Sequence, residues 1–317
     1  MEEKLLIEKI LAGDPIALSK AITLCESTLE KEQKIAQNII AACTNKEKES
    51  IRIGITGVPG VGKSTFINSF GKMLTAKGKK VAVLAIDPTS EKTQGSILGD
   101  KSRMTDLAKD KNAFIRPSPS AGTLGGVASK TRENILLCEA AGFDIILIET
   151  VGVGQNETTV NNLVDFFLLL MLSGAGDQLQ GIKRGIMEMA DAILINKADG
   201  DNVQNAKNAM LQYKSALHLF PANVNGWQVE VNCCSALEKI GLDKVWGAIE
   251  KHNSQTHGNG FFAENRKVQK IFWLHHAIKE ELGNKKYTQL NKNGEIKKME
   301  ERFLNKEVTI PQLLEVL

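Results

Sequence analysis

One stretch near residue 60 has the residue types and the spacing of a phosphate-binding loop. Gly57, Gly62, Lys63 and Ser64 satisfy the pattern G-x-x-x-x-G-K-[ST]. Glycines let backbone N–H groups converge on phosphate oxygens, the lysine reaches the β- and γ-phosphates, and the serine hydroxyl can ligate Mg²⁺. The residues that we expect to contact a nucleotide here are Gly57, Val58, Pro59, Gly60, Val61, Gly62, Lys63, Ser64 and Thr65.

A second motif indicates which base is bound. Asn196, Lys197 and Asp199 form N-K-x-D directly after an apolar run. The aspartate can accept hydrogen bonds from N1–H and N2–H₂ of guanine, whereas a mismatched base would leave its charge unpaired. Ser235, Ala236 and Leu237 follow a later apolar run and would contact guanine O6 through backbone N–H groups. We therefore expect GTP or GDP as the bound nucleotide.

Acidic residues at strand ends suggest a metal site beside the phosphates. Glu149 closes an apolar run in the position of a Walker B acid, and Gly152 could donate its N–H to the γ-phosphate. A solvated strand end is the plainer interpretation of Glu149. Mg²⁺ prefers oxygen ligands. The candidate ligands are Ser64, Asp87, Asp100 and Glu149.

Short apolar runs that alternate with helical segments must position these residues. Such alternation predicts an α/β fold with a mostly parallel sheet flanked by helices, here of the P-loop NTPase type, with ligands at the carboxyl ends of the strands. The predicted strands are 51–56, 81–87, 113–116, 143–149, 166–172, 192–196 and 229–233.

The rest of the chain is predicted to be helical. We expect an N-terminal extension of two helices over residues 1–48, the P-loop domain over 49–256 and a C-terminal helical arm over 257–317. Asp14 and Pro15 form an N-cap and first-turn pair.

Composition excludes several classes of protein. The 317 residues carry 40 Lys plus Arg against 37 Asp plus Glu, and only 5% of them are aromatic, which argues against nucleic acid as a partner. No apolar run is long enough for a membrane span, and the N-terminus lacks a signal pattern, so we expect no membrane partner and a cytoplasmic location. The five cysteines lack C-x-x-C spacing and are predicted to be core residues.

Six segments together resemble the MeaB/ArgK/MMAA family of P-loop GTPases. They are G-V-P-G-V-G-K-S-T, A-I-D-P-T-S, G-S-I-L-G-D-K-S-R-M, E-T-V-G-V-G-Q-N-E, G-A-G-D-Q-L-Q-G-I-K-R-G and N-K-A-D, within residues 10–285. The resemblance implies a GTPase that acts as a chaperone for an adenosylcobalamin-dependent acyl-CoA mutase of the methylmalonyl-CoA type, gates cofactor loading, and forms a homodimer through its C-terminal arm. It also implies that Asp87, Asp100 and Glu149 lie near Mg²⁺.

The resemblance further implies a third switch loop over residues 174–183, in which Asp177 and Lys183 are candidate switch residues. Lys183 is thus a candidate catalytic residue beside Lys63 and Glu149. An N-cap at Asp177 and a surface Lys183 are the plainer alternatives. The chain departs from the family pattern, because it has T-Q-G-S for T-G-G-S and S-G-A-G-D-Q-L for P-G-A-G-D-E-L. These differences bear on the client protein and on the strength of coupling to it.

Phosphoryl transfer depends on positioning and electrostatics, so we expect slow GTP hydrolysis by the isolated chain. Gln155 and Arg103 are candidates to orient water or to stabilise charge. Two alternatives stay open at this point: a GTPase chaperone for nickel insertion and a P-loop kinase linked to amino-acid transport. A GTPase bound to nucleic acid is a further alternative that the charge balance and the few aromatic residues disfavour.

Overall fold

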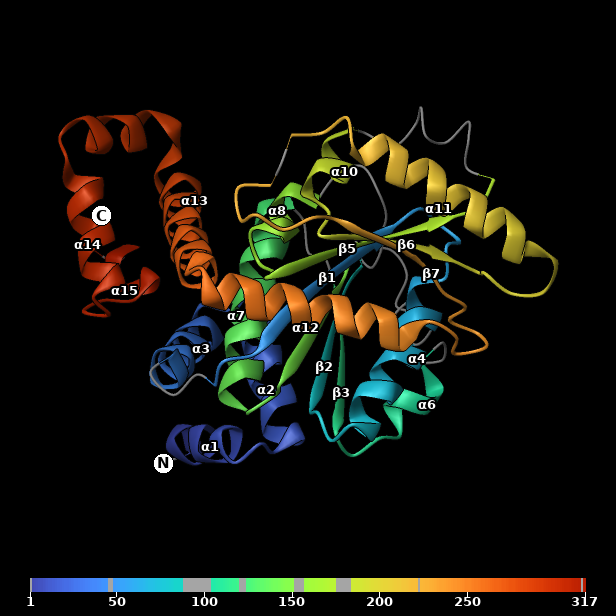
Figure 1. Ribbon diagram of the computed structural model, residues 1–317. Helices are drawn as coiled ribbons and strands as arrows, with labels where there is room; N and C mark the ends of the chain where they lie inside the picture. Colours follow the sequence, from blue (N-terminus) through green and yellow to red (C-terminus); the bar gives the residue numbers. More distant parts are fainter. Residues whose placement is uncertain are drawn as a thin grey trace.

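The computed structural model describes residues 2–44, 48–87, 104–119, 124–150, 157–174, 184–221, 223–314 and 316–317. The described chain forms a seven-stranded sheet in the order β3-β2-β4-β1-β5-β6-β7, in which every strand pair is parallel (Figure 1). The strands are β1 (Ile51–Gly57), β2 (Val81–Asp87), β3 (Ala113–Pro119), β4 (Ile145–Glu149), β5 (Phe166–Leu172), β6 (Ala192–Asn196) and β7 (Glu230–Cys233). The predicted fold class is confirmed.

Strand β1 lies at the centre of the sheet, between β4 and β5. The chain adds β2 and β3 on one side, returns to insert β4, and then continues to β5 on the other side. Parallel α/β sheets bind ligands where the strand order reverses in this way, outside the carboxyl ends of the strands. The phosphate-binding motif begins at the carboxyl end of β1 and therefore lies at this position.

Helices cover both faces of the sheet. On one face lie α4 (Lys63–Ala76), α6 (Thr105–Ala108) and α12 (Leu242–Gly258), packed on side chains such as Ile53 and Ile55. The other face is covered by α7 (Leu124–Ala140), α8 (Glu157–Asn161), α10 (Arg184–Met189) and α11 (Val203–Leu217), with the 3₁₀ helix Gly200–Asn202 before α11. Because both faces are buried, β4 and β6 consist almost entirely of apolar residues.

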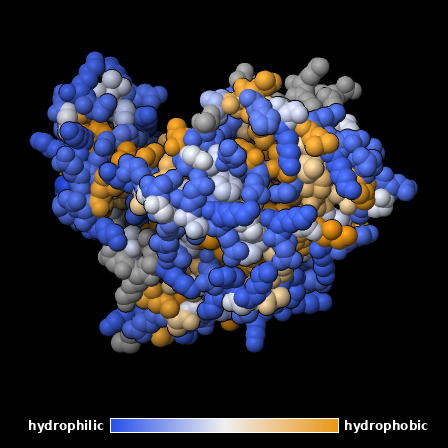
Figure 2. Space-filling model, in the orientation of Figure 1, coloured by the Kyte–Doolittle hydropathy of each residue, from blue (hydrophilic) through white to orange (hydrophobic). Residues whose placement is uncertain are grey.

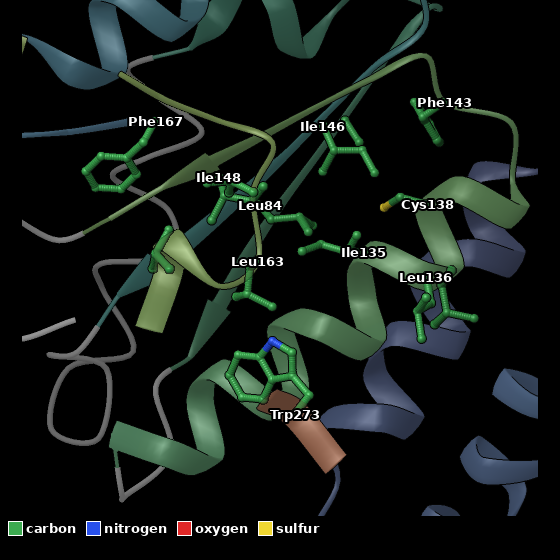
Figure 3. Packing of buried hydrophobic residues seen from close by; sticks show 14 of the residues in the cluster. Leu84, Ile135, Leu136, Cys138, Phe143, Ile146, Ile148, Leu163, Phe167 and Trp273 are labelled. Atoms are coloured by element: carbon green, nitrogen blue, oxygen red, sulfur yellow. The ribbon is translucent and has the colours of Figure 1, made fainter. Parts of the chain in front are cut away.

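The packing on the second face is shown in Figure 3. Ile135 and Cys138 of α7 point toward the sheet and lie beside Ile146, whereas Leu136 on the same helix faces the N-terminal helices. Trp273 comes from the C-terminal part of the chain and lies beside Leu163. One continuous core thus includes the sheet, the N-terminal helices and the beginning of the C-terminal arm.

The N-terminal extension has three helices, so the prediction of two was wrong. They are α1 (Glu2–Leu11), α2 (Pro15–Glu26) and α3 (Glu30–Cys43). The break between α2 and α3 occurs because Ser27 adopts an extended backbone and its Oγ accepts a hydrogen bond from Leu29 N–H at 3.1 Å. Such local bonding by serine competes with a continuous helix. The predicted cap before α2 is confirmed, since Asp14 accepts hydrogen bonds from two first-turn N–H groups.

All five cysteines are free thiols, and four of them are buried while Cys233 is half-buried. Their predicted place in the core is confirmed for those four. No helix in the described ranges combines the length and the apolar character that a membrane span requires.

The C-terminal arm consists of α13 (Phe261–Lys292), α14 (Glu295–Leu304) and α15 (Ile310–Leu314). Helix α12 runs to Gly258, two residues beyond the expected domain boundary, and the turn follows at Gly260, whose φ is 78°. Helix α13 is interrupted at Gly283, where φ is 71° and ψ is 163°, and α14 then packs back against α13. The arm projects from the body in Figure 1, and a notch separates its tip from the body in Figure 2.

A buried ion-pair network fixes the arm to the sheet. Arg266 of α13 donates to both carboxylate oxygens of Asp165 at 2.5 and 2.6 Å, to Glu139 at 3.1 Å and to the carbonyl of Ser50 at 2.9 Å. Arg52 of β1 donates to both oxygens of Glu139 at 2.7 and 2.8 Å. Burial alone would raise the pKa of Glu139, but Arg52, Arg266 and the Ser50 hydroxyl lower it to about 2.

Removal of one partner from this network should destabilise the fold strongly. Arg266→Met leaves two buried carboxylates short of a cation, and we expect a loss of about 3–5 kcal/mol in the free energy of unfolding, measured by urea denaturation. The matched control is Lys267→Met, because Lys267 is half exposed and its nearest acid lies at 3.9 Å. We expect a change within about 0.5 kcal/mol for the control. Equal losses in the two variants would contradict a stabilising network.

The low pKa of Glu139 also predicts a pH dependence. A carboxyl group with a pKa of about 2 in the folded chain and 4.5 as its ordinary value contributes stability above pH 4.5, and this contribution is lost as the pH falls from 4.5 toward 2. Near neutral pH, the free energy of unfolding of wild type should therefore be about 3 kcal/mol higher than that of Glu139→Gln. The gap should close on acidification, as measured by urea denaturation at stepped pH values. A gap independent of pH would be the contrary result.

Candidate guanine-nucleotide site

The loop between β1 and α4 has the backbone shape that a phosphate-binding loop needs. A Cβ atom at Gly57 would lie 2.5 Å from the carbonyl oxygen of Leu170, so only glycine fits there. Gly62 has a φ of 91° and directly precedes α4, in a left-handed conformation that favours glycine. The loop therefore leads into the N-terminus of a 14-residue helix, where N–H groups and the helix dipole favour an anion.

Three candidate side chains meet at this loop. Lys63 Nζ donates to the carbonyl of Gly57 at 2.9 Å, and Ser64 Oγ donates to Glu149 Oε1 at 3.1 Å. Burial lowers the pKa of Lys63 below its ordinary value, and the nearby Glu149 carboxylate offsets part of this decrease. Glu149 is only 8% exposed at the end of β4, so the interpretation as a solvated strand end does not hold.

Asn196 joins the phosphate loop to the second part of the site. Its Nδ2 donates to the carbonyl of Val61 at 2.8 Å, and its Oδ1 accepts from Ala236 N–H at 3.1 Å and from the Cys234 thiol at 3.3 Å. The side chain is 2% exposed. Asn196 thus fixes two loops that are distant in sequence rather than pointing freely at a ligand.

Asp199 is held by the turn that follows β7. Ser235 Oγ donates to Asp199 Oδ2, and Ser235 also pairs through its backbone with Ile240. Lys197 adopts a left-handed φ of 58° and is exposed, which leaves its side chain on the solvent side of the loop. The structure therefore brings N-K-x-D together with the predicted turn 235–237, at the same edge of the sheet as the phosphate loop.

Between Ser235 and Ile240, the backbone of this turn has two N–H groups without an acceptor among the described residues, those of Leu237 and Lys239. Ser235 N–H donates to Ile240, Ala236 N–H to Asn196, and Glu238 N–H to Ser235 Oγ at 3.0 Å. Leu237 N–H has no such partner, and the Leu237 side chain is 76% exposed. Of the N–H groups expected to contact a base, Leu237 N–H is therefore the one that is available.

Several candidates cannot be placed. The backbone of Asp87 ends β2, but its side chain lies outside the described part of the structure. Entirely outside the described residues are Asp100, Arg103, Gly152, Gln155, Asp177 and Lys183. Their assigned roles stay predictions.

Sequence reasoning missed some residues that shape the site. Ser69 of α4 donates to the carbonyl of Ala236 at 2.7 Å, and Thr150 Oγ1 donates to Thr56 Oγ1 at 2.9 Å between the ends of β4 and β1. A serine inside a helix and a threonine after a strand carry no motif of their own. Only the packing of the elements reveals their contacts.

Comparison with known proteins supplies the family. Residues 18–291 match the family described as "Methylmalonyl Co-A mutase-associated GTPase MeaB". This chain belongs to the MeaB family of GTPases. The enzyme therefore binds guanine nucleotide and hydrolyses GTP, in agreement with the predicted activity and with the recognised family.

Individual relatives cover most of the chain. The protein "GTPase ArgK" of Escherichia coli (strain K12) is 47% identical over 88% of this chain and 84% of its own length. The "Methylmalonic aciduria type A homolog, mitochondrial" of Mus musculus is 44% identical over 86% of this chain and 68% of its own length. The crystal structure of a protein named "LAO/AO transport system kinase" shares 35% identity, with a TM-score of 0.76, over 96% of this chain and 97% of that one.

The site geometry of this MeaB-family GTPase predicts a change of base preference in Asp199→Asn. The amide would accept from Ser235 through its oxygen and present N–H to the base, which fits the 2-oxo group of xanthine and not the 2-amino group of guanine. For Asp199→Asn we expect the affinity for GDP to fall by about 100-fold or more and the affinity for xanthosine diphosphate (XDP) to rise, both measured by calorimetry. Asp201→Asn, an exposed position two residues on, is the control. An equal loss for GDP and XDP would refute the assigned role of Asp199.

Proposed function

We propose that this GTPase acts as a chaperone for an adenosylcobalamin-dependent acyl-CoA mutase of the methylmalonyl-CoA type. In this proposal it gates the loading of the cofactor into the mutase and protects or reactivates the mutase. The observation that supports the proposal most strongly is the match of 18–291 to a family described as associated with that mutase. The named relative from Mus musculus, a methylmalonic aciduria protein, points in the same direction.

The proposed roles of the site residues follow from charge and position. Lys63, released from the carbonyl of Gly57, would neutralise charge on the β- and γ-phosphates, while Asp199 and the turn 235–237 would hold guanine. The oxygens of Ser64 and Glu149 lie 3.1 Å apart and are of the kind that Mg²⁺ prefers, so these two residues fit a magnesium site. When bound, Mg²⁺ would offset negative charge on the phosphates.

We expect slow hydrolysis in the absence of a partner. Lys63 donates to the carbonyl of Gly57 and Ser64 donates to Glu149, whereas the candidates to orient water or stabilise charge, Gln155 and Arg103, lie outside the described residues. A GTPase without a residue that orients water or stabilises the transition state turns over slowly, and such a residue accelerates it by about 10³–10⁵-fold. A partner that orders the site would then act as the accelerator.

A second candidate is a P-loop kinase linked to amino-acid transport. It is favoured by the 35% identity between this chain and the protein named "LAO/AO transport system kinase". In that case the γ-phosphate would pass to an acceptor hydroxyl or protein group rather than to water. A test of function must therefore identify the product as well as measure the rate.

We expect the mutase to accelerate hydrolysis. GTP labelled in the γ-phosphate is mixed with the chain alone, and with the apo-mutase of the same organism, and the released phosphate and any labelled protein are separated. The expected result is free phosphate at a rate at least about tenfold above that of the chain alone, because the partner completes the site. Lys63→Ala should abolish the signal.

Three outcomes would count against the proposal. An unchanged rate with mutase would oppose the chaperone role, and label on an acceptor would favour the kinase. Acceleration by an apo nickel enzyme instead would favour the nickel-insertion alternative.

The homodimer through α13 to α15 and the cytoplasmic location also stay predictions. Sedimentation analysis of the purified chain tests the homodimer.

A further inference from the structure

Ser69 connects the helix of the phosphate loop to the turn expected to contact the base. It lies inside α4, and its hydroxyl donates to the carbonyl oxygen of Ala236 at 2.7 Å across 167 positions of sequence. The residue is 5% exposed. The contact is therefore a buried hydrogen bond between two elements of the site, of a kind that leaves an unsatisfied carbonyl when the donor is removed.

The carbonyl of Ala236 and the N–H of Leu237 belong to the same peptide unit. That unit is planar and trans, so its C=O and N–H point in opposite directions. A hydrogen bond that holds the carbonyl toward α4 consequently turns Leu237 N–H away from α4. Leu237 N–H has no acceptor among the described residues, and Leu237 itself is exposed.

The other anchors of the turn leave this peptide plane free. Asn196 holds Ala236 through its N–H, on the preceding peptide, and Ser235 pairs with Ile240. Among the described contacts, the bond from Ser69 acts on the peptide between Ala236 and Leu237 itself. Loss of that bond would let the peptide rotate while the rest of the turn stays attached.

We propose that Ser69 is a positioning residue for recognition of the 6-oxo group of guanine, and that it acts by aiming Leu237 N–H at that oxygen. The inference rests on the proposed guanine pocket formed by Asp199 and the turn 235–237. Ser69 contacts no nucleotide in this account. Through Ser69, helix α4, which begins at the phosphate-binding loop, would also set the direction of the Leu237 N–H donor at the base.

The test compares two nucleotides that differ at position 6. GDP carries the 6-oxo group, whereas 2-aminopurine riboside diphosphate carries hydrogen there, has no N1–H in consequence, and keeps the 2-amino group and both phosphates. The loss of N1–H affects wild type and variant alike, so the change in each affinity on substitution reports the contact to position 6. Affinities of the full-length wild type and of Ser69→Ala are measured by calorimetry, and unfolding is followed for both. We expect GDP affinity to fall by about tenfold in Ser69→Ala, the scale of one such hydrogen bond, while affinity for the analogue stays unchanged.

Thr75→Val is the matched control. It removes another buried hydroxyl from α4, one that contacts Lys72 and Asp110 instead of the turn. We expect it to leave the ratio of the two affinities as in wild type, whatever its effect on unfolding.

Two results would overturn the inference and can be told apart. An equal loss of both affinities in Ser69→Ala would mean that Ser69 only supports the fold of α4. If wild type itself binds GDP and the analogue equally well, the guanine pocket at the turn 235–237 is wrong, and the role of Ser69 falls with it.

Discussion

The side-chain amide of Asn196 joins the two halves of the nucleotide site. Its nitrogen holds the phosphate loop at Val61 and its oxygen holds the turn at Ala236, at 2.8 and 3.1 Å. Because the amide is buried, neither bond competes with water, and a loss of either would leave a polar group unsatisfied. The spacing between the phosphate end and the base end of the site therefore depends on one short, rigid side chain, with Ser69 as a second connection on the α4 side.

The parallel sheet makes that connection possible. The phosphate loop, Glu149, N-K-x-D and the turn at Ser235 follow β1, β4, β6 and β7, whose carboxyl ends meet at one edge. At the opposite edge, Arg266 of the C-terminal arm is bound to Glu139 and Asp165. The arm is thus attached to the strands β1 and β5 near their beginnings, while the nucleotide site lies at their ends.

Family membership and local geometry contribute different parts of the functional conclusion. The family gives GTP hydrolysis and suggests the client. The local geometry supports a guanine site, with Lys63, Ser64 and Glu149 grouped at the phosphate-binding loop and with Asp199 held by Ser235. The identity of the γ-phosphate acceptor distinguishes the chaperone proposal from the kinase proposal. A product analysis with the mutase addresses this question directly.

The sequence by itself determined the strands and the phosphate loop, because apolar runs and glycine-dependent backbone shapes are local properties. Strands β2, β5 and β6 have the predicted bounds, since their apolar runs are buried on both faces. The break at Ser27 was not predictable, because it depends on a hydrogen bond rather than on apolar periodicity. Only the tertiary structure decided the contacts between distant elements. Asn196 was predictable as part of a motif, but its attachment to two loops follows from strand order. Ser69 and Arg266 carry no signal in the sequence, since a serine or an arginine within a helix is ordinarily solvated. Their roles arise because folding places a carbonyl or a carboxylate, remote in the chain, within hydrogen-bond distance in a buried site.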